Sequence, residues 1–130
     1  MQARHILSSF LLAALMAAQA YAADIRIAVA AEGAKADATV SAMAGRAPNI
    51  LIFDAKGKLL SAQPNPTANL SSGAGPALAR WLAEQKVNTL VAGQVGGNMA
   101  DEMKRLNIRA VTGKGPADQA AKAATQAGAK

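Results

Sequence analysis

An arginine, two methionines and two glycine-rich segments of this sequence can hold a ligand. Arg46 follows Gly45 in a segment of small residues, and its planar guanidinium can clamp an oxyanion or a thioanion. A surface position, or an ion pair with an acid such as Glu32, is the alternative for Arg46. No nucleophile and base stand at a spacing that suggests a catalytic pair, so we expect a binding protein and not an enzyme.

The glycine-rich segments precede two predicted helices and can form an anion cradle. They cover residues 71–75 and 93–98. Backbone N–H groups at a helix N-terminus can bind an anion, and the helix dipole adds partial positive charge. Neither segment matches a Walker P-loop or a dinucleotide-binding fingerprint, and glycine before a helix also serves as a cap. We predict that the ligand-binding residues are Gly45, Arg46, Ser72, Gly73, Gly75, Gly96, Gly97 and Asn98.

Methionine supplies the soft ligands of this chain, because cysteine is absent and the sole histidine is His5. Thioether sulfur favours soft ions such as Cu(I). Met43 lies in a polar loop, where burial explains it less well, whereas Met99 and Met103 recur at helical spacing. We predict Met43 and Met99 as metal ligands, with simple core packing as the alternative for Met99 and the expectation for Met103.

The first residues have the pattern of a signal peptide. Arg4 precedes an apolar run from Ile6 to Ala18, and Ala20-Tyr21-Ala22 has the small-x-small form of a cleavage site. An uncleaved anchor is the alternative, but the run is shorter than the roughly 20 apolar residues that span a bilayer. We therefore predict a cleaved signal peptide over residues 1–22, one domain over residues 23–130, and a periplasmic or secreted protein.

Charge and composition exclude several classes of partner. Without Arg4 the chain has 13 basic and 8 acidic residues, a balance of +5 that favours anions in general. Phe53 and Trp81 are the only aromatic residues after residue 22, too few for a platform that stacks nucleic-acid bases. No second long apolar run follows the first. We expect no nucleic-acid partner and no membrane contact after cleavage.

Hydrophobic patterning predicts the elements that position the candidate residues. We expect strands over residues 24–30, 50–54, 59–63, 89–92 and 108–112, and helices over 76–86, over 99–106 and after Pro116. Leu78, Trp81 and Leu82 should share the buried face of the first helix. The order βββαβαβα indicates an α/β, ribonuclease-H-like mixed sheet of about five strands with helices on its faces. Ligands bind beyond the carboxyl ends of parallel strands, where the loops after Ala30 and Ala92 should meet.

These segments together resemble the dinitrogenase iron-molybdenum cofactor biosynthesis family, in the form of a NifX/NafY-like domain. The resemblance rests on residues 25–30, 41–48, 50–54, 65–66, 73–75 and 93–98. It implies a ribonuclease-H-like domain whose loops hold a metallocluster or an anionic precursor. Relatives that bind molybdenum-copper sulfide clusters are known. Members commonly carry histidine where Met43 stands and an aromatic residue where Ala44 stands, so a nitrogen ligand is replaced here by a soft thioether.

We therefore expect an exported binding protein that holds or carries a metal-sulfur cluster or an anionic metal precursor. The cluster would be iron-molybdenum-cofactor-like or a molybdenum-copper sulfide, and a periplasmic protein would be its partner. Export removes the chain from the cytoplasm, where nitrogenase cofactor is assembled, so a role in nitrogen fixation does not follow. The alternatives are a periplasmic Cu(I)-binding protein that uses Met43 with Met99, and a cluster-free interaction module.

Overall fold

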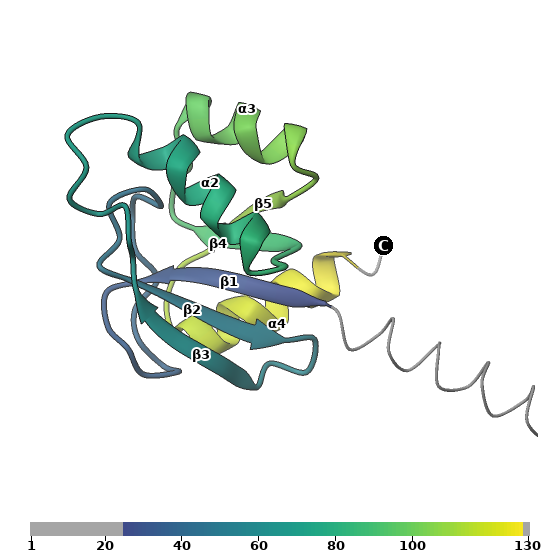
Figure 1. Ribbon diagram of the computed structural model, residues 1–130. Helices are drawn as coiled ribbons and strands as arrows, with labels where there is room; N and C mark the ends of the chain where they lie inside the picture. The colour runs from purple at the N-terminus through teal and green to yellow at the C-terminus, as the bar shows by residue number, and fades with distance from the viewer. Residues whose placement is uncertain (1–24, 129–130) are drawn as a thin grey trace, which may run out of the picture.

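The computed structural model describes residues 25–128, which form a five-stranded sheet with helices on both faces (Figure 1). The elements are β1 (Arg26–Ala31), β2 (Asn49–Asp54), β3 (Leu59–Pro64), α2 (Ala74–Glu84), β4 (Thr89–Ala92), α3 (Gly97–Arg105), β5 (Arg109–Thr112) and α4 (Ala117–Gly128). Their order and the predicted α/β class are confirmed, with boundaries within a few residues of those expected. The predicted signal peptide lies outside the described residues. Within the described part, no helix is long and apolar enough to cross a membrane.

The sheet is mixed, with strand order β3-β2-β1-β4-β5. Strand β2 pairs antiparallel with both β3 and β1, whereas β4 pairs parallel with both β1 and β5. Because β1 and β4 are covered on both faces, they are apolar after their first residues, Arg26 and Thr89, and all four residues of β4 are buried. The parallel strands end on one side of the sheet, and the loops that follow them meet there.

Alternate side chains of the strands divide the interior into two cores. The core under α2 and α3 contains the β1 and β2 residues Ala28, Ala30, Ile50 and Ile52. The core under α4 contains the intervening residues Ile27, Val29, Leu51 and Phe53. Helix α4 presents only alanines to this core, namely Ala117, Ala120, Ala121 and Ala124. Small side chains let this helix lie close to β1, the strand it contacts most.

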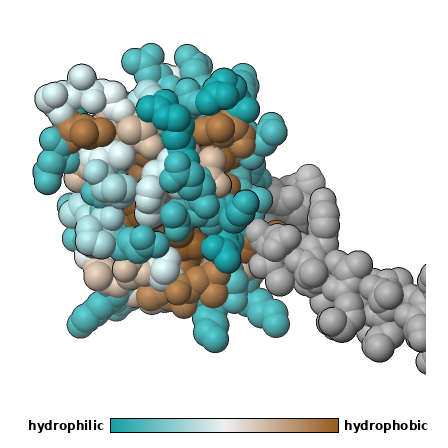
Figure 2. All heavy atoms as spheres, in the orientation of Figure 1, coloured by the Kyte–Doolittle hydropathy of each residue, from teal (hydrophilic) through white to brown (hydrophobic). Residues whose placement is uncertain are grey.

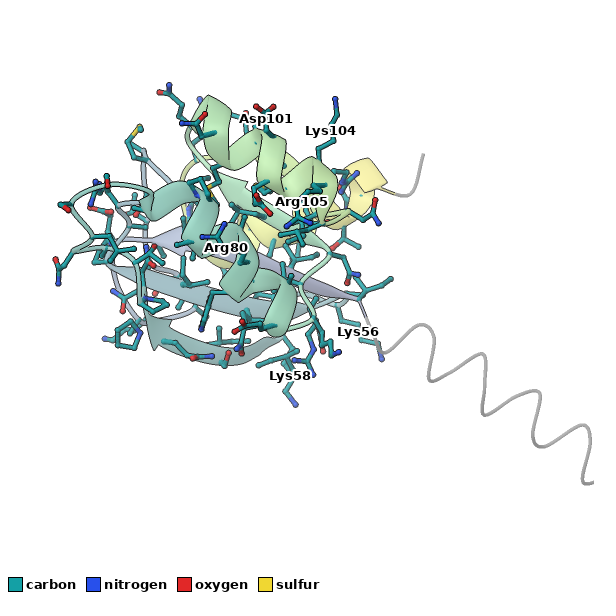
Figure 3. The ribbon with its side chains drawn as sticks, turned by 45° about the horizontal axis from the view of Figure 1, so that its top comes forward. Lys56, Lys58, Arg80, Asp101, Lys104 and Arg105 are labelled. Atoms are coloured by element: carbon teal, nitrogen blue, oxygen red, sulfur yellow. The ribbon has the colours of Figure 1, made fainter. Side chains whose placement is uncertain are left out.

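Helix α2 buries Leu78 and Leu82 completely. Trp81 packs against the same core but is only half-buried, so the prediction of one shared buried face was right for the two leucines and partly right for Trp81. On the outer surface, Nη1 of Arg80 on α2 lies 3.9 Å from Oε2 of Glu102 on α3 (Figure 3). The other carboxylate oxygen of Glu102 contacts Arg105. Exposed ion pairs of this kind add little stability. The apolar core therefore holds α2 and α3 in place.

The outer surface of α2 and α3 is mainly hydrophilic, and apolar atoms gather along the lower edge of the molecule, over β3 (Figure 2). Strand β3 is an edge strand whose burial alternates, and its Leu60 is 48% exposed. Leu82, on the inner face of α2, is by contrast fully buried. The chain thus offers two leucines in opposite environments.

Replacing Leu82 with alanine should lower the free energy of unfolding by about 2–5 kcal/mol, because the substitution leaves a cavity in the core. Leu60→Ala should change it by no more than about 0.5 kcal/mol, since Leu60 lies on the surface of an edge strand and is already 48% exposed. Urea denaturation followed by circular dichroism measures both values. Equal losses in the two variants would contradict the assignment of α2 to the core.

Candidate functional site

A pocket of about 260 Å³ lies between the loop of residues 41–48 and the N-terminal ends of α2 and α3. Its lining residues are Met43, Gly45, Arg46, Gly73, Ala74, Gly75, Pro76, Gly96, Gly97, Asn98 and Met99. Every residue predicted to bind the ligand is among them except Ser72, which is exposed and stands just before Gly73. Ala74 and Pro76 were not predicted, although they belong to the same helix start.

Both helices begin at the pocket without help from a side chain. The N-cap residues are Gly73 and Gly96, neither cap has a side-chain hydrogen bond, and neither first turn contains an acidic residue. Gly73 adopts the left-handed conformation with φ of 71°, which a residue with a side chain rarely tolerates. The first backbone N–H groups of a helix have no partner within the helix. Two sets of such donors, each with the positive end of a helix dipole, therefore border one pocket.

Glycine lets the three segments around the pocket approach one another. A Cβ atom on Gly45 would lie 3.2 Å from the backbone nitrogen of Gly75. One on Gly75 would lie only 2.8 Å from the Cβ atom of Met99. Met99 is 1% exposed and packs behind Gly75, and Met103 is equally buried in the core, as expected.

Arg46 is the only charged side chain among the lining residues. Its Nη1 atom donates hydrogen bonds to the carbonyl oxygens of Ala68, at 3.1 Å, and Leu70. The alternative partner Glu32 instead accepts a hydrogen bond from Ser41. Among the described residues, the Nη2 and Nε atoms of Arg46 make no hydrogen bond, so one edge of the guanidinium anchors the loop and the other can bind a ligand.

Asn65 fixes the position of the Arg46 loop and was recognised in the sequence only as part of the family pattern. Its Nδ2 atom donates to the carbonyl oxygens of Ala47, at 2.9 Å, and Gly45, at 3.3 Å. Its Oδ1 atom accepts hydrogen bonds from the backbone nitrogen and hydroxyl of Thr67. Asn65 and Thr67 are both buried, so this network holds the two loops together in a low-dielectric setting.

Met43 stands at the rim of the pocket and is 45% exposed. Its backbone forms an isolated parallel bridge with Gln94, and the neighbouring Ala44 donates to the Gln94 carbonyl at 3.1 Å. The part of the chain that the structure describes contains no cluster of three or more His, Cys, Asp or Glu residues that could hold a metal ion. The groups available to a ligand at this site are thus backbone N–H groups, the Arg46 guanidinium, the Asn98 carboxamide and one accessible thioether.

The fold defines a small α/β domain of the ribonuclease-H-like class, with a pocket at the starts of α2 and α3. The chain belongs to the dinitrogenase iron-molybdenum cofactor family, whose model matches residues 25–127. None of the curated proteins compared with the sequence matches it.

Several solved structures are similar to this fold, including the following two. The apo form of the orange protein from Desulfovibrio gigas is 28% identical, with a TM-score of 0.72 over 78% of this chain and 88% of that chain. A Thermotoga protein of the DUF35 family, solved by NMR, is 24% identical, with a TM-score of 0.65 over 78% of this chain and 87% of that chain. The second likeness shows the fold alone.

Gly75→Ala should lower the free energy of unfolding by about 1–3 kcal/mol, because the added methyl group overlaps Met99 and forces α2 and α3 apart. Gly97→Ala is the matched control, since nothing lies within 4 Å of the position of its Cβ atom. That variant should keep its stability or gain up to about 1 kcal/mol from helix propensity. Urea denaturation compares them, and equal stability of both variants would rule out the close contact.

Proposed function

We propose that this protein binds and carries an anionic metal-sulfur species in the pocket at the starts of α2 and α3. One observation carries the proposal: two helix N-termini without side-chain caps border a pocket that contains Arg46 and no carboxylate. Helix dipoles, backbone N–H groups and a guanidinium all favour negative charge. Because loop carbonyls already hold Arg46, little side-chain entropy is lost when it binds a ligand.

Met43 makes a metal-sulfur anion a better ligand than a purely hard anion such as phosphate. Its exposed thioether is a soft donor at the same rim as the guanidinium. A sulfide cluster that includes a soft metal with an open coordination position, such as Cu(I), would use both kinds of contact. The family is described by the iron-molybdenum cofactor, which supports this chemistry, and the pocket volume of about 260 Å³ suits a small species such as a thiomolybdate or a molybdenum-copper sulfide.

The burial of Met99 weighs against the Cu(I) alternative. A site with two thioether ligands would need the Met99 sulfur to be accessible, but Met99 forms part of the pocket wall from behind Gly75 and is only 1% exposed. Bringing its sulfur forward would empty part of the core under α2 and α3, at a cost of about 2–5 kcal/mol if the whole side chain left. We therefore favour one thioether ligand, Met43, over the predicted pair.

Titration with tetrathiomolybdate tests the proposal, with absorbance and elemental analysis for molybdenum and sulfur as readouts. The wild-type protein should bind it stoichiometrically, and Arg46→Ala should weaken binding by about 10- to 100-fold, the value of a hydrogen bond to a charged group. Arg80→Ala is the matched control, because Arg80 lies on α2 outside the pocket (Figure 3) and should leave affinity unchanged.

Salt should weaken the complex, as expected for an interaction between charges near the surface.

If neither tetrathiomolybdate nor Cu(I) binds, the carrier function is wrong and the cluster-free interaction module remains. Tight Cu(I) binding without any affinity for tetrathiomolybdate would instead support the copper-binding alternative.

We also propose that the protein works outside the cytoplasm, on the strength of the apolar run and the cleavage pattern in residues 1–22. Mass spectrometry of the protein from its native cells should find an N-terminus at Ala23 or Asp24. A mass that includes the first 22 residues would contradict cleavage. The binding chemistry proposed above holds in either case, because the pocket lies wholly within the described residues.

A further inference from the structure

Met43 differs sharply from the other two methionines that the structure describes. It is 45% exposed, whereas Met99 and Met103 are each 1% exposed and packed in the core. Solvent-borne reagents can therefore reach the Met43 sulfur while the surrounding fold shields the other two. This contrast gives the chain one accessible thioether, and that thioether stands at the rim of the pocket.

An oxygen-donating oxidant such as hydrogen peroxide converts a thioether to a sulfoxide. The sulfur loses two electrons and gains one oxygen atom, the O–O bond of the peroxide breaks, and the remaining oxygen leaves as water. The product carries a polar S–O group in place of a soft, apolar sulfur. Its oxygen is a strong hydrogen-bond acceptor and a hard donor.

We propose that Met43 is an oxidant-sensitive site that controls the loading of the pocket, an inference that rests on the proposed function. Oxidation removes the soft ligand. It also places an acceptor oxygen beside Arg46 and the open N–H groups of α2 and α3, where it competes with the anion for the same donors. Both effects lower the affinity for a metal-sulfur anion.

The fold should survive this modification, which separates it from ordinary oxidative damage. Backbone contacts hold the Met43 segment: Ala44 donates to Gln94, and Gly93 donates to Ser41 at 2.8 Å. Gly93 also permits the close approach, since a Cβ atom there would lie 2.9 Å from the Cα atom of Ala42. The Met43 side chain belongs to neither core, so its conversion to the sulfoxide leaves the packing unchanged.

Peptide mass spectrometry after mild peroxide treatment tests the chemical part. Oxygen should be added to Met43 at least about tenfold faster than to Met99 or Met103, in line with their exposure. Thermal unfolding should be unchanged at full Met43 oxidation. Equal oxidation of all three methionines, or loss of the folded state along with Met43 oxidation, would overturn the proposal.

Titration of the same samples with tetrathiomolybdate in the presence of Cu(I) tests the control of loading, because the copper ion gives the Met43 sulfur a metal to bind. Oxidised wild type should bind about tenfold more weakly than untreated protein, and a methionine sulfoxide reductase should restore the affinity. Met43→Gln, which carries a permanent polar acceptor, should bind as weakly as the oxidised protein. Met43→Leu keeps the bulk without an oxidisable sulfur, so peroxide should leave its affinity unchanged.

Two failures are distinguishable. If untreated wild type binds tetrathiomolybdate and the oxidised form binds it equally well, the control of loading is wrong and the carrier function stands. If untreated wild type does not bind, the carrier function fails and the control of loading fails with it.

Discussion

Backbone crowding around Gly45, Gly75 and Gly93 sets the geometry of the site. At each position a Cβ atom would lie 3.2 Å or less from a neighbouring segment. The absence of side chains lets the loop of residues 41–48 settle against the start of α2, and α2 against α3. Larger residues there would separate the two helix N-termini, and the shared set of N–H donors would be lost.

The mixed sheet brings the loops that form the pocket to one side of the domain. Parallel pairing of β1 with β4 brings the loops after both strands to one side of the sheet, which is where α3 begins. The antiparallel β2 and β3 return the chain to that side, so that the long loop before α2 can reach Arg46. Asn65 then locks this loop to the one before β2. The pocket is built from irregular segments, but regular elements hold each of them.

Much of this could be predicted from the sequence because it depends on local patterns. The run Thr89–Ala92 was found with its observed bounds, and the rule for open α/β sheets brought the loops after Ala30 and Ala92 to one side. The bonds from Arg46 to Ala68 and Leu70 could not be predicted, because the loop between β3 and α2 has no periodicity to fix its path. The nearly complete burial of Met99 could not be predicted either. Helical spacing shows which face of a helix a residue occupies, but it does not show how closely another helix covers that face.

Strand β1 separates the pocket from the point where the described chain begins. Six residues of extended strand span roughly 20 Å, and Ile25 lies at one end while the loops that form the pocket lie at the other (Figure 1). Lys56 and Lys58 lie at the Ile25 end, away from the pocket (Figure 3). A tether, a fused domain or a solid support joined before Ile25 would therefore leave the mouth of the pocket unobstructed. The protein could be displayed by its N-terminus on a sensor surface and still exchange its ligand with solution.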